Sequence, residues 1–275
     1  MRYSAAVTVV LLCGASVCGR AQWLNYPARG TPRTRDGKPN LAESAPRTSF
    51  GKPDLSGIWQ AEGAPIEELV KVLPGGVNGL REATPSKYFL NILSDFQAEE
   101  ALIRPEAAAL FLKRLHAFGK DSPGTHRLPA GVPQAALLPA PYKLVQIREM
   151  IVMLYEAIYT DGRTHTADPQ PTWMGYSVGK WEGDTLVVDA VGFNDRSWLD
   201  AMGHQHSDAM RITERYHRRD FGHMKVQITI DDPKTFTRPF TIKFNQALLP
   251  DTDLIESFCS EDEKRRWASG GQVDS

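Results

Sequence analysis

The chain has 275 residues, a formal net charge of −1 and 41% hydrophobic residues, enough for one large domain or two modest ones with a substantial core. No run of lysine and arginine stands clear of neighbouring acids, so the composition does not favour a nucleic-acid partner. The basic cluster Arg215–Arg219 has Glu214 and Asp220 on either side and is expected to be the solvated face of a strand.

Residues 1–21 have the pattern of a secretory signal peptide. Arg2 gives a positive start, residues 5–17 form an apolar run, and a small-x-small cleavage sequence ends at Ala21. The apolar run is too short to serve as a stable membrane anchor. We therefore expect a periplasmic or secreted protein with no integral membrane segment after cleavage.

Cleavage leaves 30 basic residues against 33 acidic ones and one cysteine, Cys259. An exported chain with one thiol can form no internal disulfide and depends on its core for stability. Cys259 follows Ile255 and Phe258 with no histidine nearby, so we expect it to pack in the core rather than act as a nucleophile. Lipidation at Cys13 or Cys18 and an uncleaved N-terminal anchor stay open as alternatives.

Residues 22–54 are rich in Pro, Gly, Arg and Thr and show no apolar period. They contain a short internal repeat, because Asp36–Leu41 has the sequence DGKPNL and Phe50–Leu55 has the sequence FGKPDL. Each copy predicts a turn in which the proline fixes the backbone. We expect an extended arm that tethers the domain or lies across it, with a binding role for the arm as the alternative.

The folded domain is predicted over residues 55–260, followed by a loose tail over 261–275. Its first strand is Ser56–Gln60, which contains the triplet Gly57-Ile58-Trp59. A Gly-x-Trp in the first strand is reminiscent of lipocalin-type barrels, in which the Trp closes one end. The indole is in any case expected to be buried.

Residues 63–141 do not show strand patterns. A short helix is predicted over Ser86–Phe96. A longer one is predicted over Pro105–Lys120, where the proline stands in the first turn and basic residues come late. A proline-rich loop follows the second helix. An insertion of this size in a compact domain is typical of a functional cap.

From Tyr142 onward, strand patterns follow one another closely. Met224–Asp231 alternates apolar and polar residues, which predicts one buried and one wet face, and short turns such as Glu182-Gly183-Asp184 predict hairpins. The predicted strands are Tyr142–Arg148, Met150–Ala157, Tyr159–Arg163, Thr172–Trp181, Thr185–Phe193, Met210–Arg219, Met224–Asp231, Pro239–Gln246 and Leu254–Cys259. The sequence therefore predicts a mainly β fold, an antiparallel meander that closes into a lipocalin-like barrel with a helical insertion and an extended N-terminal arm.

Two carboxylates fall on strand faces that are otherwise apolar. Glu214 shares a face with Ile212 and Tyr216, and Glu156 shares a face with Val152, Leu154 and Ile158. A buried carboxylate must be paired, hydrogen-bonded or protonated. Inside a barrel, Glu156 and Glu214 are expected to orient a ligand or to act as general acids or bases. An internal salt bridge or a tyrosine hydrogen bond is the alternative.

A long connection between two predicted strands carries His204 and His206, which project to the same side of an extended chain. Together with His165 from another loop, they are compatible with zinc or another divalent metal, so His165, His204 and His206 are the predicted metal ligands. Without a metal, His206, Asp200 and Glu214 are the predicted catalytic residues. A purely structural loop is the third interpretation.

The chain also has more indoles than packing requires, and these side chains suit a pocket for an apolar or sugar-like ligand. The predicted ligand-binding residues are Glu156, Trp173, Tyr176, Trp198 and Tyr216.

Several longer motifs carry a family resemblance. These are GKPDLSGIW, DPQPTWMGYSVGKWEGDTLVV, GFNDRSWLD, GHQHSDAMRITER and TIDDPKTFTRPF, spread over most of residues 48–260. Together they resemble a large group of secreted bacterial proteins of unassigned function, common in soil Acidobacteria. The resemblance implies export and a single β-rich domain, and it implies no reaction.

Three classes of function remain. The first is an exported protein that binds a small, partly apolar molecule, oriented by Glu156 and Glu214. The second is a hydrolase, lyase or isomerase that uses Asp200, His204, His206 and His165, with or without a divalent metal. The third is an interaction module of the cell envelope that uses its arm. A convergence of the histidines in one pocket would favour the enzyme.

Overall fold

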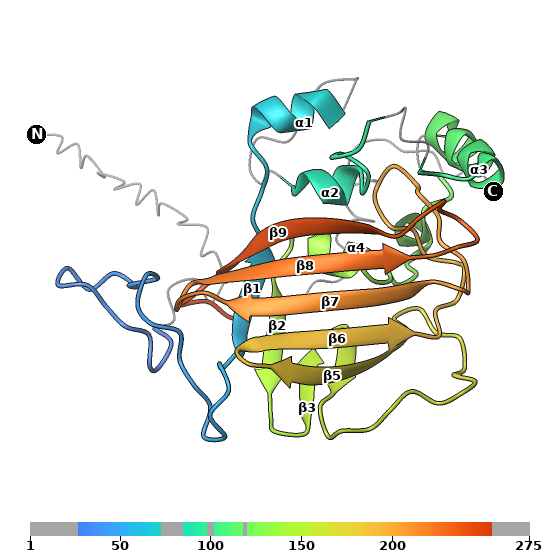
Figure 1. Ribbon diagram of the computed structural model, residues 1–275. Coiled ribbons are helices and arrows are strands. Elements are labelled where there is room, and N and C mark those ends of the chain that lie inside the picture. Colours follow the sequence, from blue (N-terminus) through green and yellow to red (C-terminus); the bar gives the residue numbers. More distant parts are fainter. Residues whose placement is uncertain (1–26, 73–84, 98–101, 118–119, 255–275) are drawn as a thin grey trace, which may run out of the picture.

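The structure is a computed structural model that describes residues 27–72, 85–97, 102–117 and 120–254. One closed barrel with the strand order β1 to β9 dominates these residues (Figure 1). Its strands are β1 (Gly57–Ala61), β2 (Tyr142–Gln146), β3 (Met150–Met153), β4 (Glu156–Tyr159), β5 (Tyr176–Glu182), β6 (Thr185–Val191), β7 (Arg211–Arg218), β8 (His223–Asp231) and β9 (Phe240–Leu248). The predicted mainly β fold and its closure into a barrel are confirmed.

The barrel closes where β1 meets β9. Trp59 lies opposite Leu248 in this antiparallel pair and opposite Tyr142 in the pair that β1 makes with β2. The closing strand is β9 rather than the predicted strand Leu254–Cys259, of which residues 255–259 lie outside the described residues. Closure leaves no free sheet edge, which removes a site for unwanted strand pairing.

Three details of the predicted meander are wrong. The predicted strand Met150–Ala157 is split, because the chain turns at Leu154-Tyr155 and Met153 pairs with Glu156 across the turn. The predicted strand Tyr159–Arg163 contributes only its first residue, to β4. The meander is also not wholly antiparallel, since β4 and β5 run parallel. The long connection between them gives the chain room to cross over, as a parallel pair requires.

Side chains alternate between the inside and the outside of the barrel. Along β8, Met224, Val226, Ile228 and Ile230 are buried while the residues between them are more exposed. The same period on β7 places Glu214 inside with 1% of its surface exposed. The apolar faces of the strands supply most of the core, and burial of such faces is the main favourable term in folding.

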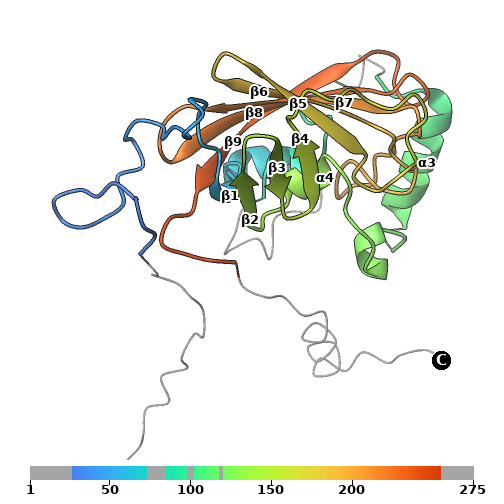
Figure 2. The same cartoon turned by 90° about the horizontal axis from the view of Figure 1, so that it is seen from below.

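The insertion covers one end of the barrel. Its helices are α1 (Ile66–Val72), α2 (Lys87–Leu90), α3 (Pro105–His116) and α4 (Gln134–Leu137), with a 3₁₀ turn at Pro123–His126. Seen from below, α3 lies at the end of the barrel opposite the N-terminal arm (Figure 2). Both predicted helices exist but are shorter than expected, and α1 and α4 had no sequence signal that we recognised. Within the described residues, none of the helices has the length and apolarity needed to cross a membrane.

The described part of the arm contains the same turn twice. Arg33 donates to the carbonyl of Gly37 at 3.0 Å, and Arg47 donates to the carbonyl of Gly51 at 2.9 Å. Each glycine has a φ near +80°, a conformation that side chains disfavour. Each arginine also forms an ion pair with a carboxylate on the barrel side, Arg33 with Asp251 and Arg47 with Asp184. The internal repeat therefore forms the same turn twice, and an ion pair connects each turn to the barrel side.

Candidate functional site

Inside the barrel, polar side chains from several strands form one cluster, here called the interior cluster. Strand alternation on β7 turns Glu214 and Tyr216 inward, and the tight turn between β3 and β4 brings Tyr155 and Glu156 to the same region. The members of the interior cluster are Tyr142, Tyr155, Glu156, Glu214, Tyr216 and Gln246.

Few of these polar atoms bond to one another. The Tyr142 hydroxyl donates to the Gln246 Oε1 at 2.6 Å, and the Tyr155 hydroxyl lies 3.1 Å from the Met153 sulfur. Within the described residues, several buried atoms have no hydrogen-bond partner. These atoms are both carboxylate oxygens of Glu156, Oε2 of Glu214, the Tyr216 hydroxyl and Nε2 of Gln246. Buried polar groups in proteins are almost always hydrogen-bonded, so this concentration calls for an explanation.

Burial also changes the acidity of the two carboxyl groups. Burial first, and then the charge of Glu214, raise the pKa of Glu156 well above its usual range. Burial raises the pKa of Glu214 to about 7, against a smaller lowering by the neighbouring Tyr216 hydroxyl. Burial raises the pKa of Tyr216 as well. Near neutral pH the cluster therefore offers a neutral carboxylic acid, phenolic donors, and one carboxyl group that is partly ionised.

The loop between β6 and β7 holds a second polar arrangement, centred on Asp200. This carboxylate is fully buried and accepts hydrogen bonds from the backbone N–H groups of Ile92, Gly203 and His204. It also bonds to the His204 Nδ1 at 2.5 Å, and the imidazole stacks on Phe111. Asp200 thus ties the loop to the segment after α2, and both of its carboxylate oxygens accept hydrogen bonds there.

His206 has a different partner. Its Nε2 lies 2.6 Å from Oγ of Ser197, and its Nδ1 lies 3.1 Å from the carbonyl of Ser207. Burial lowers the pKa of His206, so the neutral ring donates from Nδ1 and accepts the Ser197 proton at Nε2. Ser197 is fully buried, and a Cβ added at Gly131 would lie 2.3 Å from its Oγ. The Ser197 hydroxyl therefore bonds to His206 in a closely packed interior.

His165 lies on the outer surface of the barrel. Its Nε2 is 3.0 Å from Asp189 on β6, and Asp189 also receives two hydrogen bonds from Arg211. Tyr176 contacts the edge of the imidazole ring. The predicted ligands His165, His204 and His206 thus have separate partners. Among the described residues, no group of three or more histidine, cysteine, aspartate or glutamate side chains is arranged to hold a metal ion.

The other predicted site residues also lie at separate places in the fold. The predicted catalytic residues Asp200, His206 and Glu214 belong to three separate arrangements. Of the predicted ligand-binding residues, Glu156 and Tyr216 meet inside the barrel. Tyr176 instead bonds to Arg163 outside it. Trp198 is buried in the β6–β7 loop beneath Arg114, and the backbone carbonyl of Trp173 lies near Gly131.

Three members of the interior cluster were not predicted from the sequence as site residues. For Gln246 the signal was present: Ile242, Phe244 and Gln246 alternate on the buried face of β9, so a polar residue stands where an apolar one is expected. Tyr142 and Tyr155 carried no such signal, because tyrosine is common on both faces of strands. No protein-family model matches the sequence, and no curated protein or solved structure is similar enough to serve as a relative.

Proposed function

We propose that the protein binds a small, uncharged, oxygen-bearing molecule at the interior cluster. The observation that carries this proposal is the set of buried polar atoms on Glu156, Glu214, Tyr216 and Gln246 that have no partner among the described residues. Each unsatisfied buried polar group costs about 1–3 kcal/mol. A ligand that bonds to these atoms would recover that cost on binding. The interior of a barrel with about eight strands is either filled by side chains or holds one small ligand.

The chemistry of the cluster defines the ligand further. The neutral carboxyl of Glu156 and the Tyr216 hydroxyl donate hydrogen bonds, and Glu214 accepts one when it is ionised. The neighbouring interior residues, such as Ile228 and Ile242, are apolar and fully buried. A ligand with one acceptor oxygen on a compact apolar body fits this environment. A charged ligand would be disfavoured by desolvation.

Cyclohexanone is a suitable probe, and thermal unfolding of the full chain is a suitable measurement. At a probe concentration tenfold above Kd, binding adds about 1.4 kcal/mol to the free energy of unfolding and raises Tm by about 2–4 °C. The rise should disappear in Tyr216→Phe. It should persist in Tyr159→Phe, because Tyr159 stacks on Tyr176 and belongs to the outer face. No rise, or an equal rise in both variants, contradicts the proposal.

A second candidate function is acid–base catalysis at the same cluster. It is favoured by the different environments of the carboxyl groups, since the pKa of Glu214 is raised to about 7 and that of Glu156 lies well above its usual range. Such a pair suits a reaction in which Glu214 removes a proton next to a carbonyl while Glu156 donates one to the oxygen. The product is the enol, and reversal returns a proton to carbon.

Hydrogen–deuterium exchange into cyclohexanone tests this candidate. In D₂O the protein should speed exchange of the hydrogens next to the carbonyl, as followed by proton NMR. Glu214→Gln should remove this acceleration while the probe still raises Tm. Acceleration that survives in Glu214→Gln contradicts a catalytic role for this carboxyl. Binding without acceleration leaves the protein as a carrier.

Export is also part of the proposed function. The support is the charge and apolar pattern of residues 1–21, which lie outside the described residues. Expression of the full chain in a bacterial host, followed by fractionation and N-terminal sequencing, tests it. The mature protein should begin near residue 22 and appear outside the cytoplasm. An intact N-terminus in the cytoplasmic fraction contradicts export.

A further inference from the structure

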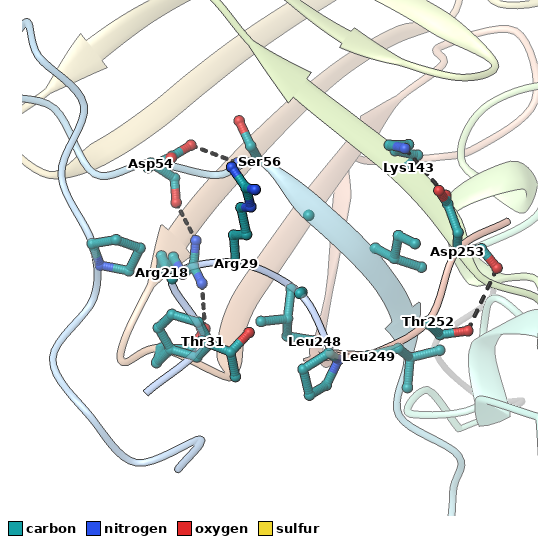
Figure 3. Close-up of a pocket in the computed structure, with 17 residues that line it drawn as sticks. Arg29, Thr31, Asp54, Ser56, Lys143, Arg218, Leu248, Leu249, Thr252 and Asp253 are labelled. Atoms are coloured by element: carbon teal, nitrogen blue, oxygen red, sulfur yellow. Dashed lines mark hydrogen bonds and ion pairs between the residues drawn. The ribbon is translucent and has the colours of Figure 1, made fainter. Parts of the chain in front are cut away.

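The arm and one end of the barrel enclose a groove of about 450 Å³, within the range typical of ligand sites. Figure 3 shows the groove between arm residues such as Arg29 and Thr31 and the barrel residues Ser56 and Leu248. The groove lies outside the interior cluster, and none of its lining residues belongs to that cluster. A ligand bound there is independent of the proposed function.

Arg218 gives the groove a buried positive charge. Its guanidinium lies over the rings of Trp59 and Phe221, 5.0 and 5.3 Å from the ring centroids. Its donors reach the backbone carbonyls of Asp54, Asp220 and Phe221. No side chain among the described residues forms an ion pair with it. Burial lowers its pKa to about 10, against a smaller opposing effect of the nearby carboxylates of Asp54 and Asp220. A buried charge without an ion-pair partner favours a nearby anion.

Arg29 supplies a second cation without a partner. It is exposed and has no hydrogen bond or ion pair among the described residues, and in Figure 3 its side chain extends between the arm and Ser56. The third cation of the lining, Lys143, is paired with Asp253 at 3.1 Å. The lining thus has three cations and two carboxylates, those of Asp54 and Asp253. The net positive charge of one favours a monoanion.

The remaining lining is apolar. Ile58 and Leu248 are each only 7% exposed, and they form part of the wall together with Leu249, Phe221, Pro46 and Pro250. The ion pair of Arg33 with Asp251, together with a hydrogen bond from the Ala28 N–H to Asp251, holds the arm in place over this wall. A groove with an apolar wall and unpaired cations matches a ligand with an apolar body and one anionic head.

We propose that this groove binds a free anionic amphiphile, a carboxylate on a short apolar chain. The head group contacts Arg29 near Arg218, and the chain lies along Leu248 and Leu249. The arm forms one wall of the site and is required for binding.

Isothermal titration of the full chain with sodium decanoate tests this proposal. Arg29→Ala should weaken binding about tenfold, the effect of losing one hydrogen bond to a charged group. The matched control is Arg35→Ala, which removes an equal charge from the arm at a position that does not line the groove, and it should bind as the unchanged protein does. Decyltrimethylammonium, with the same chain and the opposite charge, should not bind.

Three outcomes overturn the proposal. The first is no binding of decanoate. The second is equal weakening by Arg29→Ala and Arg35→Ala. The third is binding of decyltrimethylammonium as tight as that of decanoate. Sedimentation with phosphatidylglycerol vesicles separates a free ligand from a membrane lipid. Vesicle binding that depends on Arg29, in a protein that does not bind decanoate, overturns the assignment to a free amphiphile.

Discussion

Glu156 and Glu214 are buried near each other inside the barrel, although they stand on β4 and β7. Burial and the charge of Glu214 raise the pKa of Glu156, and burial raises the pKa of Glu214. The strand order explains how such a pair arises, because closure of the sheet directs inward-facing residues of non-adjacent strands to a shared interior. The pair has measurable consequences for stability and for binding.

The first prediction concerns stability against pH. Glu214 has a pKa of about 7 in the folded protein, against a usual value of 4.5. Because the folded-state pKa is the higher one, the unfolded state loses this proton first as pH rises. The free energy of unfolding should therefore fall by about 3 kcal/mol between pH 4.5 and pH 7. Glu156, whose pKa is also raised, adds to the loss and extends it to higher pH.

Urea unfolding across this pH range measures the effect. Glu214→Gln mimics the protonated carboxyl, so it should match the unchanged protein near pH 4.5 and exceed it in stability above pH 7. Exposed carboxylates whose pKa values are lowered, such as that of Asp184, act in the opposite direction and at more acidic pH. A stability that is flat between pH 4.5 and pH 7 in both proteins would show that Glu214 titrates normally.

The second prediction compares two tyrosines. Tyr216→Phe removes a buried hydroxyl without a partner among the described residues, so the free energy of unfolding should stay level or rise by up to about 1 kcal/mol. Tyr142→Phe instead removes the donor to Gln246 and should cost about 1–2 kcal/mol. Denaturant unfolding without added ligand measures both. A larger loss in Tyr216→Phe than in Tyr142→Phe would be contrary to the described hydrogen bonding.

The third prediction concerns Asp200. Asp200→Ala leaves three backbone N–H groups and the His204 imidazole without their buried acceptor. The free energy of unfolding should fall by about 3–5 kcal/mol. Asp195→Ala is the matched control in the same loop, since Asp195 is exposed, and it should change stability by less than about 0.5 kcal/mol. Similar losses in both variants would remove the structural role of Asp200.

The fourth prediction concerns the arm. Asp251 has a φ of +58°, which asparagine also tolerates, so Asp251→Asn keeps the backbone and removes the charge that Arg33 binds. Amide hydrogen exchange by mass spectrometry should become faster over residues 27–33 and stay unchanged in β7 and β8. Asp231→Asn, at an exposed site at the end of β8, should alter neither region. Unchanged exchange in the arm of Asp251→Asn would show that this ion pair does not hold it.

Strand alternation predicted the barrel and three of the six members of the interior cluster. It turned Glu214 and Tyr216 inward correctly, because β7 keeps a strict period of two. It missed the turn at Leu154-Tyr155, since these bulky residues lack the Gly, Pro, Asn and Asp signals of tight turns. The predicted alternation that placed Glu156 with Leu154 is wrong, because Leu154 is 59% exposed. Glu156 lies inside because the tight turn brings it to the same face as its partner Met153.

His165, His204 and His206 do not meet at one place in the structure, for a different reason. Spacing along the chain places His204 and His206 near each other, but it does not reveal which buried partner each ring selects. His204 bonds to Asp200, and His206 bonds to Ser197. Both pairs are positioned by segments that are distant in the sequence, around Ile92 and Gly131. The sequence likewise did not predict Asp189 as the partner of His165, because their contact depends on how the loop after β4 folds across the outer face.

The most direct test of the central claim is a pH titration of the glutamate carboxyl carbons by ¹³C NMR in the full chain, with Glu156→Gln and Glu214→Gln for assignment. The claim predicts that Glu214 titrates at about pH 7, that Glu156 titrates above the usual range of glutamate, and that cyclohexanone shifts both signals. If both carboxyls titrate below about pH 5, as exposed glutamates do, and the probe moves neither signal, the interior cluster is not a binding site.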